Sequence, residues 1–259
     1  MSSSDTPYPL SDEQVAQYQR DGFIQIGNVL DPPDLARLRE AVVAAVEAEK
    51  APRPAGQTKS PYEQIFIQKV NLWRRHPAVR EFALCKRFGD LAARLSGQPV
   101  RVWHDQALFK EPREGAKTPW HQDAYYWPHH DRTAQITIWL ALSDVTVENG
   151  CMSFIPGSQH VRHLGPIDLA HPQNIFELAP QFKGVKPRTC ELKAGSCTFH
   201  NGLTFHYAGP NKSERMREAF AVLYMPDGTK YDGKKHVVTD PLNLKVGDKL
   251  EGEMFPLVG

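Results

Sequence analysis

The chain from Val100 onward consists of short apolar runs separated by turn-forming residues. The runs read VRVWHDQALFK, AQITIWLALSDV, CMSFIPGS, RTCELKAGSCTFH, TFHYAGP and REAFAVLYMP. Short apolar runs with Pro, Gly and Asn between them are typical of antiparallel strands in a sandwich or barrel. Gly150 in VENG and Gly195 in ELKAGS favour tight turns, because glycine adopts a positive φ without steric cost. The pattern therefore predicts a β core over residues 100–228.

The N-terminal third carries helical signals instead. Ser11 and Gln14 form a capping-box pattern, and Gly22 stands where a short helix would end. Residues 31–50 begin with an Asp cap and a first-turn proline, and their apolar residues recur at helical spacing. A further helical region, 77–95, is predicted to break at Gly89. These segments predict a helical buttress, residues 10–99, packed on the β core.

The predicted organisation is one domain, residues 10–259, preceded by a disordered leader. Residues 1–9 are polar and proline-bearing, with little to bury. At 259 residues the chain is within the range of a single barrel or sandwich with added helices. Residues 229–259 have mixed charge and no clear period, so they form a C-terminal extension that either closes over the site as a lid or decorates the surface.

Charge and hydropathy narrow the class of partner. The 31 basic and 30 acidic residues include no basic block, so nothing points to a nucleic acid or a membrane surface. No signal-peptide pattern stands at the first residues, and no uncharged apolar run approaches the ~20 residues that span a bilayer. The four cysteines lack CxxC spacing, which favours reduced thiols over a zinc ribbon. We therefore expect a cytoplasmic protein that acts on a small molecule.

The stretch TPWHQDAYYWP holds a candidate pair of metal ligands. His121 and Asp123 are two positions apart, so they would share one face if WHQD is an extended strand. His-x-Asp also occurs by chance, with the histidine hydrogen-bonded to the carboxylate. His129 and Asp131 have the same spacing, but they follow Pro128 in a polar stretch that predicts a solvated loop. The first pair is therefore the stronger candidate.

A third ligand is expected from a later strand. The segment FHNGLTFHYAGP supplies His200 and His206, and their spacing leaves the choice between them open. A strand beginning near Met216 would place Arg217 at the head of a face that is otherwise small and apolar. A buried guanidinium needs an anion, either a structural carboxylate or a carboxylate of a bound ligand. Two histidines and one carboxylate leave positions open on a metal, as in non-haem Fe(II) oxygenases, and a keto acid anchored by Arg217 would fit there.

The segments PWHQD, TIWLALSDVTVENGCMSFIPGS and LKAGSCTFHNGLTFHYAGPNKSERMR, in this order and spacing, resemble the phytanoyl-CoA dioxygenase family of Fe(II)/2-oxoglutarate-dependent oxygenases. The resemblance covers residues 11–228. It implies an α+β fold with a double-stranded β-helix core, a cupin-like jelly roll, and supporting helices mainly from the N-terminal third. It also implies His121, Asp123 and His206 as iron ligands, with Arg217, eleven residues after His206, as the 2-oxoglutarate arginine.

The same resemblance implies Fe(II) as cofactor, 2-oxoglutarate and O₂ as co-substrates, and hydroxylation coupled to formation of succinate and CO₂. Trp139 and Lys69 match family residues beside the 2-oxoglutarate, with core packing as the alternative for Trp139. Asp123 favours hydroxylation, because related halogenases have a small residue at that position. Ala208 stands where the family often has a Ser or Thr that helps the arginine, so Arg217 needs a different helper or holds the carboxylate alone.

Four further residues are candidates for substrate contact. Gln106 and Lys110 lie in HDQALFKEP, Gln68 in FIQKVN, and Tyr125 in the aromatic run that follows the metal pair. Ordinary surface exposure is the alternative for Lys110, and core packing is the alternative for Tyr125.

Three other classes of protein share part of the pattern. They are a cupin-like metal-binding protein without keto-acid turnover, an iron dioxygenase independent of 2-oxoglutarate, and an isomerase that uses its metal as a Lewis acid. Each needs the metal ligands, but none explains Arg217. The sequence therefore predicts a 2-oxoglutarate-dependent hydroxylase of a small molecule.

Overall fold

The computed structural model describes residues 4, 6–50, 58–60, 62–113, 116–162 and 164–259. Within them the helices are α1 (Asp12–Asp21), α2 (Pro32–Ala48), α3 (Pro77–Ala83), α4 (Lys86–Ser96) and the short α5 (Ile175–Leu178). Turns of 3-10 helix cover η2 (Leu72–Arg74), η3 (Asp123–Tyr126), η4 (Ser158–His160), η5 (Pro180–Phe182) and η6 (Asp240–Leu242). The longer helices thus precede the β core, as predicted.

The strands of the described residues form two antiparallel sheets. The six-stranded sheet has the order β1 (Phe23–Ile26), β8 (Cys197–Asn201), β5 (Ile136–Ala141), β10 (Arg217–Pro226), β3 (Val100–Lys110) and β2 (Ile67–Val70). The four-stranded sheet has the order β4 (Thr118–His121), β9 (His206–Ala208), β6 (Met152–Phe154) and β7 (Arg188–Cys190). Neighbouring strands in both sheets come from distant parts of the chain. The strands between residues 23 and 226 therefore form one β core.

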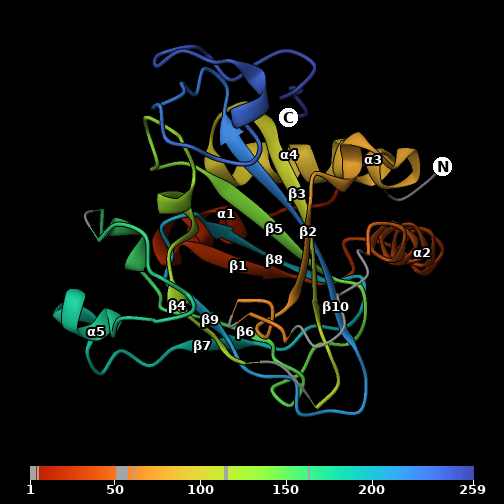
Figure 1. Ribbon diagram of the computed structural model, residues 1–259, viewed down its shortest axis with the longest axis vertical. Coiled ribbons are helices and arrows are strands. Elements are labelled where there is room, and N and C mark those ends of the chain that lie inside the picture. Colours follow the sequence, from red (N-terminus) through yellow and green to blue (C-terminus); the bar gives the residue numbers. More distant parts are fainter. Residues whose placement is uncertain (1–3, 5, 51–57, 61, 114–115, 163) are drawn as a thin grey trace.

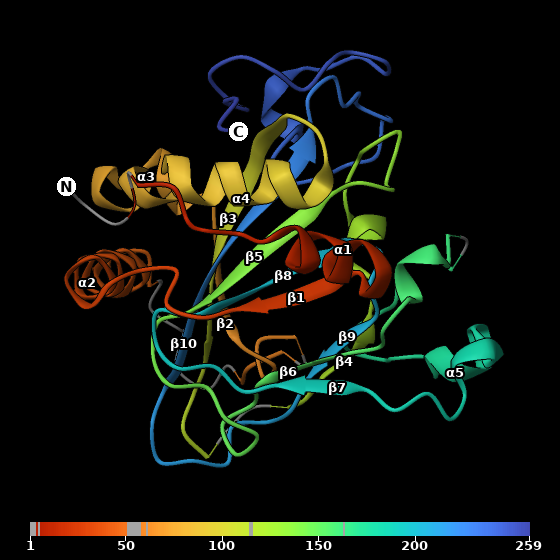
Figure 2. The ribbon, with the colours of Figure 1, turned by 180° about the vertical axis from the view of Figure 1, so that it is seen from behind.

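Helices cover one face of the larger sheet, and the smaller sheet lies towards its other face (Figures 1 and 2). Along β10, Phe220 and Val222 pack with the helices, whereas Ala219, Ala221 and Leu223 join a second core shared with the smaller sheet. This alternation confirms the face predicted for the strand that Arg217 begins. It directs the odd-numbered residues of β10 into the space between the sheets.

The helix ends follow local sequence rules with one exception. Ser11 and Gln14 form the predicted capping box, and Gly22 ends α1 with φ of 79°. The predicted break at Gly89 is wrong, because the chain breaks between α3 and α4 at residues 84–85 and Gly89 lies inside α4. A side chain on Gly89 would overlap the carbonyl oxygen of Val258. Glycine at this position makes room for the C-terminal segment.

Both terminal segments pack on the domain. The Tyr8 hydroxyl donates to the Gly27 carbonyl at 2.8 Å, and the Arg87 Nε donates to the Thr6 carbonyl at 2.7 Å. The prediction of a disordered leader is therefore wrong for residues 4 and 6–9, while residues 1–3 and 5 lie outside the described part of the chain.

The C-terminal extension continues the fold beyond β10. Val258 and Gly259 exchange backbone hydrogen bonds with Val100, and Leu250 and Phe255 are buried. The segment lies beside the ends of β3 and β10 (dark blue in Figure 1). Surface decoration is thus the wrong alternative for residues 229–259, because the segment adds to the core.

The cysteines that the structure describes are reduced thiols, as their spacing in the sequence predicts. Cys151, Cys190 and Cys197 are buried thiols. Burial raises the pKa of Cys151 and Cys190 to about 11, so both stay protonated at neutral pH.

Across the described residues, no helix is both long and apolar enough to cross a bilayer.

Candidate active site

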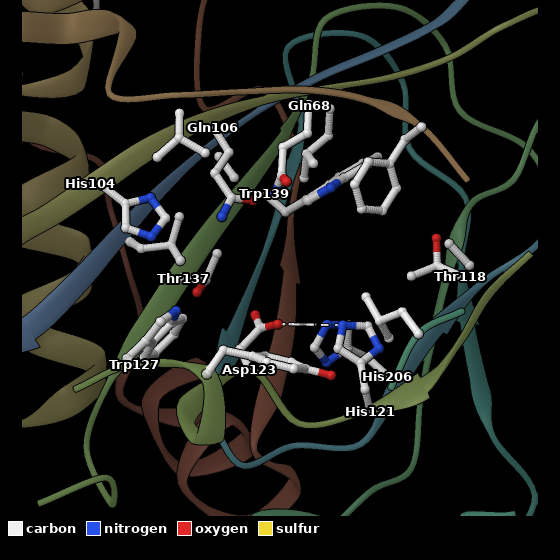
Figure 3. Close-up of a pocket in the computed structure, with 18 of the residues that line it drawn as sticks. Gln68, His104, Gln106, Thr118, His121, Asp123, Trp127, Thr137, Trp139 and His206 are labelled. Carbon is white, nitrogen blue, oxygen red and sulfur yellow. Dashed lines mark ion pairs between the residues drawn. The ribbon is translucent and has the colours of Figure 1, made fainter. Parts of the chain in front are cut away.

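A cavity of about 440 Å³ lies between the two sheets. Its walls come from β2, β3, β5 and β10 of the larger sheet, from β4, β9 and η3 opposite, and from residues 236–237 of the C-terminal segment (Figure 3). It brings together most of the residues singled out in the sequence, namely His121, Asp123, His206, Arg217, Trp139, Gln68 and Gln106.

Three of these residues form a metal-ligand cluster. The donor atoms of His121, Asp123 and His206 all lie within 4.8 Å of one another, the one such cluster that the described residues contain. The Oδ1 of Asp123 is 3.4 Å from the Nε2 of His121 and 3.6 Å from the Nε2 of His206. Ligands bound at ~2.1 Å and at right angles are separated by roughly 3 Å, so small shifts would bring all three onto one ion.

The backbone positions the three ligands. His121 of β4 lies directly opposite His206 of β9. The sequence analysis considered WHQD as an extended strand, but only its first part is extended. Strand β4 ends at His121, and Asp123 begins the η3 turn. That turn brings the carboxylate back towards both imidazoles (Figure 3).

Hydrogen bonds and charge prepare the cluster for a cation. The Nδ1 of His121 donates to the Pro119 carbonyl at 2.7 Å, and the Nδ1 of His206 donates to the Thr204 carbonyl at 3.0 Å, which leaves both Nε2 atoms available. Burial, followed by the proximity of His121, lowers the pKa of His206 to about 3. Burial opposes ionisation of Asp123, but His206 and the other nearby imidazoles hold its pKa well below the usual range. A neutral imidazole and a carboxylate are the protonation states that a divalent metal requires.

His200, the other candidate for the distal ligand, lies outside the cluster. Its Nε2 is 3.4 Å from the Oδ2 of Asp123, the oxygen that faces away from the two ligand histidines. His200 therefore orients the carboxylate from the cavity wall, and His206 is the histidine with ligand geometry.

Arg217 opens onto the same cavity without an anionic partner. It is 2% exposed, and its Nε has no hydrogen-bond partner. Its guanidinium carbon lies 5.1 Å from the centre of the Trp139 ring, and burial lowers its pKa to about 9. The adjacent Glu218 pairs with Arg39 instead. The structural-carboxylate alternative for Arg217 thus finds no support in the described residues, and Trp139 is both a core residue and a cavity residue.

Two lysines do not line the cavity. The side chains of Gln68 and Val70 face it, so Lys69 between them points away, and its ammonium donates to the Glu49 carbonyl at 2.6 Å. Lys110 is fully buried, and its Nζ donates to the carbonyls of Ala116 and Gly209 at 3.0 and 2.7 Å. The structure therefore contradicts the co-substrate role predicted for Lys69, and both the substrate contact and the surface exposure considered for Lys110.

Two predictions around η3 also need correction. Tyr125 packs against the inter-sheet core, and the next two residues of the aromatic run, Tyr126 and Trp127, line the cavity in its place. His129 is buried against Trp103, with ring centres 4.5 Å apart, so it is not part of a solvated loop. No metal pair with Asp131 results.

The sequence analysis did not identify several residues that line the cavity. His104 and Thr137 lie on the same strand faces as Gln106 and Trp139, so strand alternation applied to β3 and β5 would have found them. His236 comes from the C-terminal extension, and no local sequence pattern identifies it.

Comparison with known proteins adds independent findings. The family described as phytanoyl-CoA dioxygenase matches residues 18–219. L-proline trans-4-hydroxylase of Streptomyces griseoviridis is 33% identical over 168 residues, which are 59% of this chain and 56% of that protein. The peroxisomal phytanoyl-CoA dioxygenase of Bos taurus is 25% identical over 93% of this chain and 78% of its own length.

Solved structures resemble the chain over nearly its whole length. A non-haem α-ketoglutarate-dependent carbocyclase, SnoK from nogalamycin biosynthesis, has a TM-score of 0.86 and 31% identity, covering 98% of this chain and all of that one. The epimerase SnoN, in complex with Fe³⁺, α-ketoglutarate and nogalamycin RO, has a TM-score of 0.83 and 29% identity, covering 96% and 98%.

Fold, ligand cluster and comparisons together define a non-haem iron oxygenase that depends on 2-oxoglutarate. The chain belongs to the phytanoyl-CoA dioxygenase family.

Proposed function

We propose that His121, Asp123 and His206 hold Fe(II), that Arg217 binds the distal carboxylate of 2-oxoglutarate, and that the protein hydroxylates a small molecule in the same cavity. The observation that carries this proposal is a buried guanidinium without a carboxylate partner, facing the cavity that contains the metal-ligand cluster. Burying such a charge is costly unless an anion arrives. A dicarboxylic keto acid supplies that anion and also chelates the metal.

The chain's own residues bind and orient the reactants. Trp139 supports the guanidinium of Arg217 through its ring face. Ala208 lines the same cavity and has no hydroxyl, whereas its cross-strand partner Thr118 lines the cavity and carries one. His200 holds the Asp123 carboxylate so that Oδ1 faces the two histidines. Bound Fe(II) supplies the activation of O₂ at the expense of 2-oxoglutarate.

The two antiparallel sheets with the site between them support a double-stranded β-helix, or jelly roll, as the specific core architecture. We take residues 10–259 as one catalytic domain, since the helical region, the β core and the C-terminal segment share buried cores. A cytoplasmic location and the lack of nucleic-acid or membrane partners belong to the same proposal.

Ring closure or epimerisation is a second candidate outcome. The similar structures SnoK and SnoN are named as a carbocyclase and an epimerase. The retained Asp123 favours hydroxylation over halogenation but does not distinguish hydroxylation from these two. Product mass separates them, since hydroxylation adds one oxygen atom, ring closure removes two hydrogens, and epimerisation leaves the mass unchanged.

The test of the proposed function is Fe(II)-dependent conversion of 2-oxoglutarate to succinate. Purified protein should form succinate with Fe(II) and O₂, and His206→Ala should abolish that activity while His160→Ala, at an exposed position away from the cavity, retains it. Succinate formation that continues in His206→Ala, or that never requires iron, would overturn the proposal.

A further inference from the structure

The cavity has a charged end and an uncharged end. Arg217 begins β10 opposite Lys110, whereas Leu223, six residues along the strand, lies between His104 of β3 and Thr137 of β5. At ~3.3 Å per residue, the two rows are separated by roughly 20 Å of strand. The far row therefore lies beyond the reach of the arginine that receives the keto acid.

The uncharged end presents polar atoms that lack partners. Thr137 is 3% exposed, and its hydroxyl has no hydrogen-bond partner among the described residues. His104 uses Nδ1 to donate to the Asp105 carbonyl at 3.3 Å, which leaves Nε2 as an acceptor. Gln106 lies two residues nearer to Arg217, in register with Ala221 and Trp139, and the described residues offer its amide no hydrogen bond (Figure 3). Buried polar atoms without partners are costly, so a ligand that pairs with them gains affinity.

Apart from the Asp123 carboxylate, which contacts His200 next to Thr137, the described part of this end carries no charged side chain. Among the described lining residues Arg217 is the one permanent cation, and Asp168 at the rim pairs with His171. Burial lowers the pKa of His104 to about 3 and that of His236 to about 4, so both imidazoles are neutral. With the site loaded, the charges of Fe(II) and Arg217 equal those of Asp123 and 2-oxoglutarate. A second anionic ligand would have no counter-charge.

Aromatic rings complete the walls. Tyr126 and Trp127 come from η3 and its end, His236 comes from the C-terminal segment, and Tyr62 and Phe66 pack edge to face with ring centres 5.4 Å apart. Flat faces of this kind favour ring stacking over a flexible chain.

We propose that the substrate is an uncharged, ring-containing molecule bearing hydroxyl or carbonyl oxygens, which Thr137, His104 and Gln106 bind by hydrogen bonds. This inference rests on the proposed function, because it assigns the charged end to 2-oxoglutarate. It excludes a free amino acid, since the carboxylate would be buried without a cation.

The test compares three probes of one shape and different charge. Isothermal titration of 2-naphthylmethanol, 2-naphthoate and 2-naphthylmethylamine is carried out anaerobically on protein saturated with Fe(II) and 2-oxoglutarate, with L-proline and hexanoyl-CoA as further ligands. The neutral alcohol should bind at least about ten-fold more tightly than either charged analogue. Thr137→Val should weaken its binding about five-fold. Thr198→Val is the matched control, because Thr198 is also a buried threonine without a hydrogen-bond partner but does not line the cavity.

Tighter binding of naphthoate, proline or hexanoyl-CoA, an equal effect of the two threonine variants, or no binding of the alcohol would each overturn the inference. The saturation step keeps the two proposals apart. Protein that fails to bind 2-oxoglutarate contradicts the proposed function, whereas protein that binds it and then prefers a charged probe contradicts the substrate class alone.

Discussion

His200 and His206 approach the same carboxylate from different sheets, His200 from β8 and His206 from β9. Both imidazoles face the inter-sheet cavity and both approach Asp123, but they contact different oxygens of its carboxylate. His206 meets the oxygen that His121 also faces, and its Nδ1 is already fixed by the Thr204 carbonyl. On the proposed function, His206 binds the metal and His200 orients the carboxylate, although the sequence pattern could not distinguish the two histidines.

We predict that His206→Ala loses Fe(II) binding, whereas His200→Ala lowers the affinity by about ten-fold. The first change removes a ligand, and the second removes a hydrogen bond to the ligand carboxylate. Equilibrium dialysis against Fe(II) under anaerobic conditions measures both, with His160→Ala as control. Loss of iron in His200→Ala together with retention in His206→Ala would mean that the distal ligand is wrongly assigned.

Strand alternation explains which site residues the sequence could supply. It placed Arg217 on the cavity face, and the structure has it there. The same rule, applied to β2, would have rejected Lys69 in favour of Gln68. Asp123 could not be placed by alternation, because β4 ends before it.

At the scale of elements, the pairing of β3 with β10 buries a lysine opposite an arginine. Lys110 donates to two backbone carbonyls, and burial, followed by the charge of Arg217, lowers its pKa to about 6. A neutral amine has two N–H donors, which matches the two carbonyl acceptors. We infer that Lys110 is largely neutral above pH 7.

This protonation state makes a prediction about stability. Because the pKa of Lys110 is lowered on folding, the unfolded chain binds the extra proton between pH 6 and about 10, so the free energy of unfolding rises with pH across that range. Lys110→Met should remove up to about 1.4 kcal/mol of that rise per pH unit. Urea unfolding at pH 7, 8 and 9 measures the slope, with Lys235→Met at an exposed position as control. The same slope for wild type and Lys110→Met would contradict the buried neutral amine.

At the scale of the whole molecule, the C-terminal segment joins the helical layer to the cavity. Its last residues pair with Val100 and pass over Gly89 of α4, while His236 and Val237 reach the cavity. One segment therefore touches both the helix-side core and the site.

Gly89→Ala tests this packing. In the full chain the added methyl group would collide with the Val258 carbonyl, and we expect a loss of about 1–3 kcal/mol in the free energy of unfolding. In a variant that ends at Leu257 the collision is removed, so the same substitution should gain about 0.5–1 kcal/mol from helix propensity. Urea denaturation of the four proteins gives both differences. Equal effects in the long and short chains would show that Gly89 does not contact the segment.

Much of the fold follows from local patterns in the sequence. Caps and periodicity located α1 and α2, and apolar runs located β3 and the strands from β5 to β10. Long-range packing explains the rest. The break before α4, the contacts of residues 6–9 and the course of residues 229–259 depend on partners far away in the chain, which no window of a few residues contains.

The central claim is that Arg217 receives the distal carboxylate of a keto acid chelated to iron at His121, Asp123 and His206. Anaerobic titration of 2-oxoglutarate into the Fe(II)-loaded protein tests it through the weak visible charge-transfer band of the chelate. We predict that the band forms, that Arg217→Ala weakens 2-oxoglutarate binding by about 2–4 kcal/mol, and that Arg215→Ala, an exposed neighbour, leaves it unchanged. A protein that binds iron but never develops the band, or an Arg217→Ala variant with unchanged affinity, would contradict the claim.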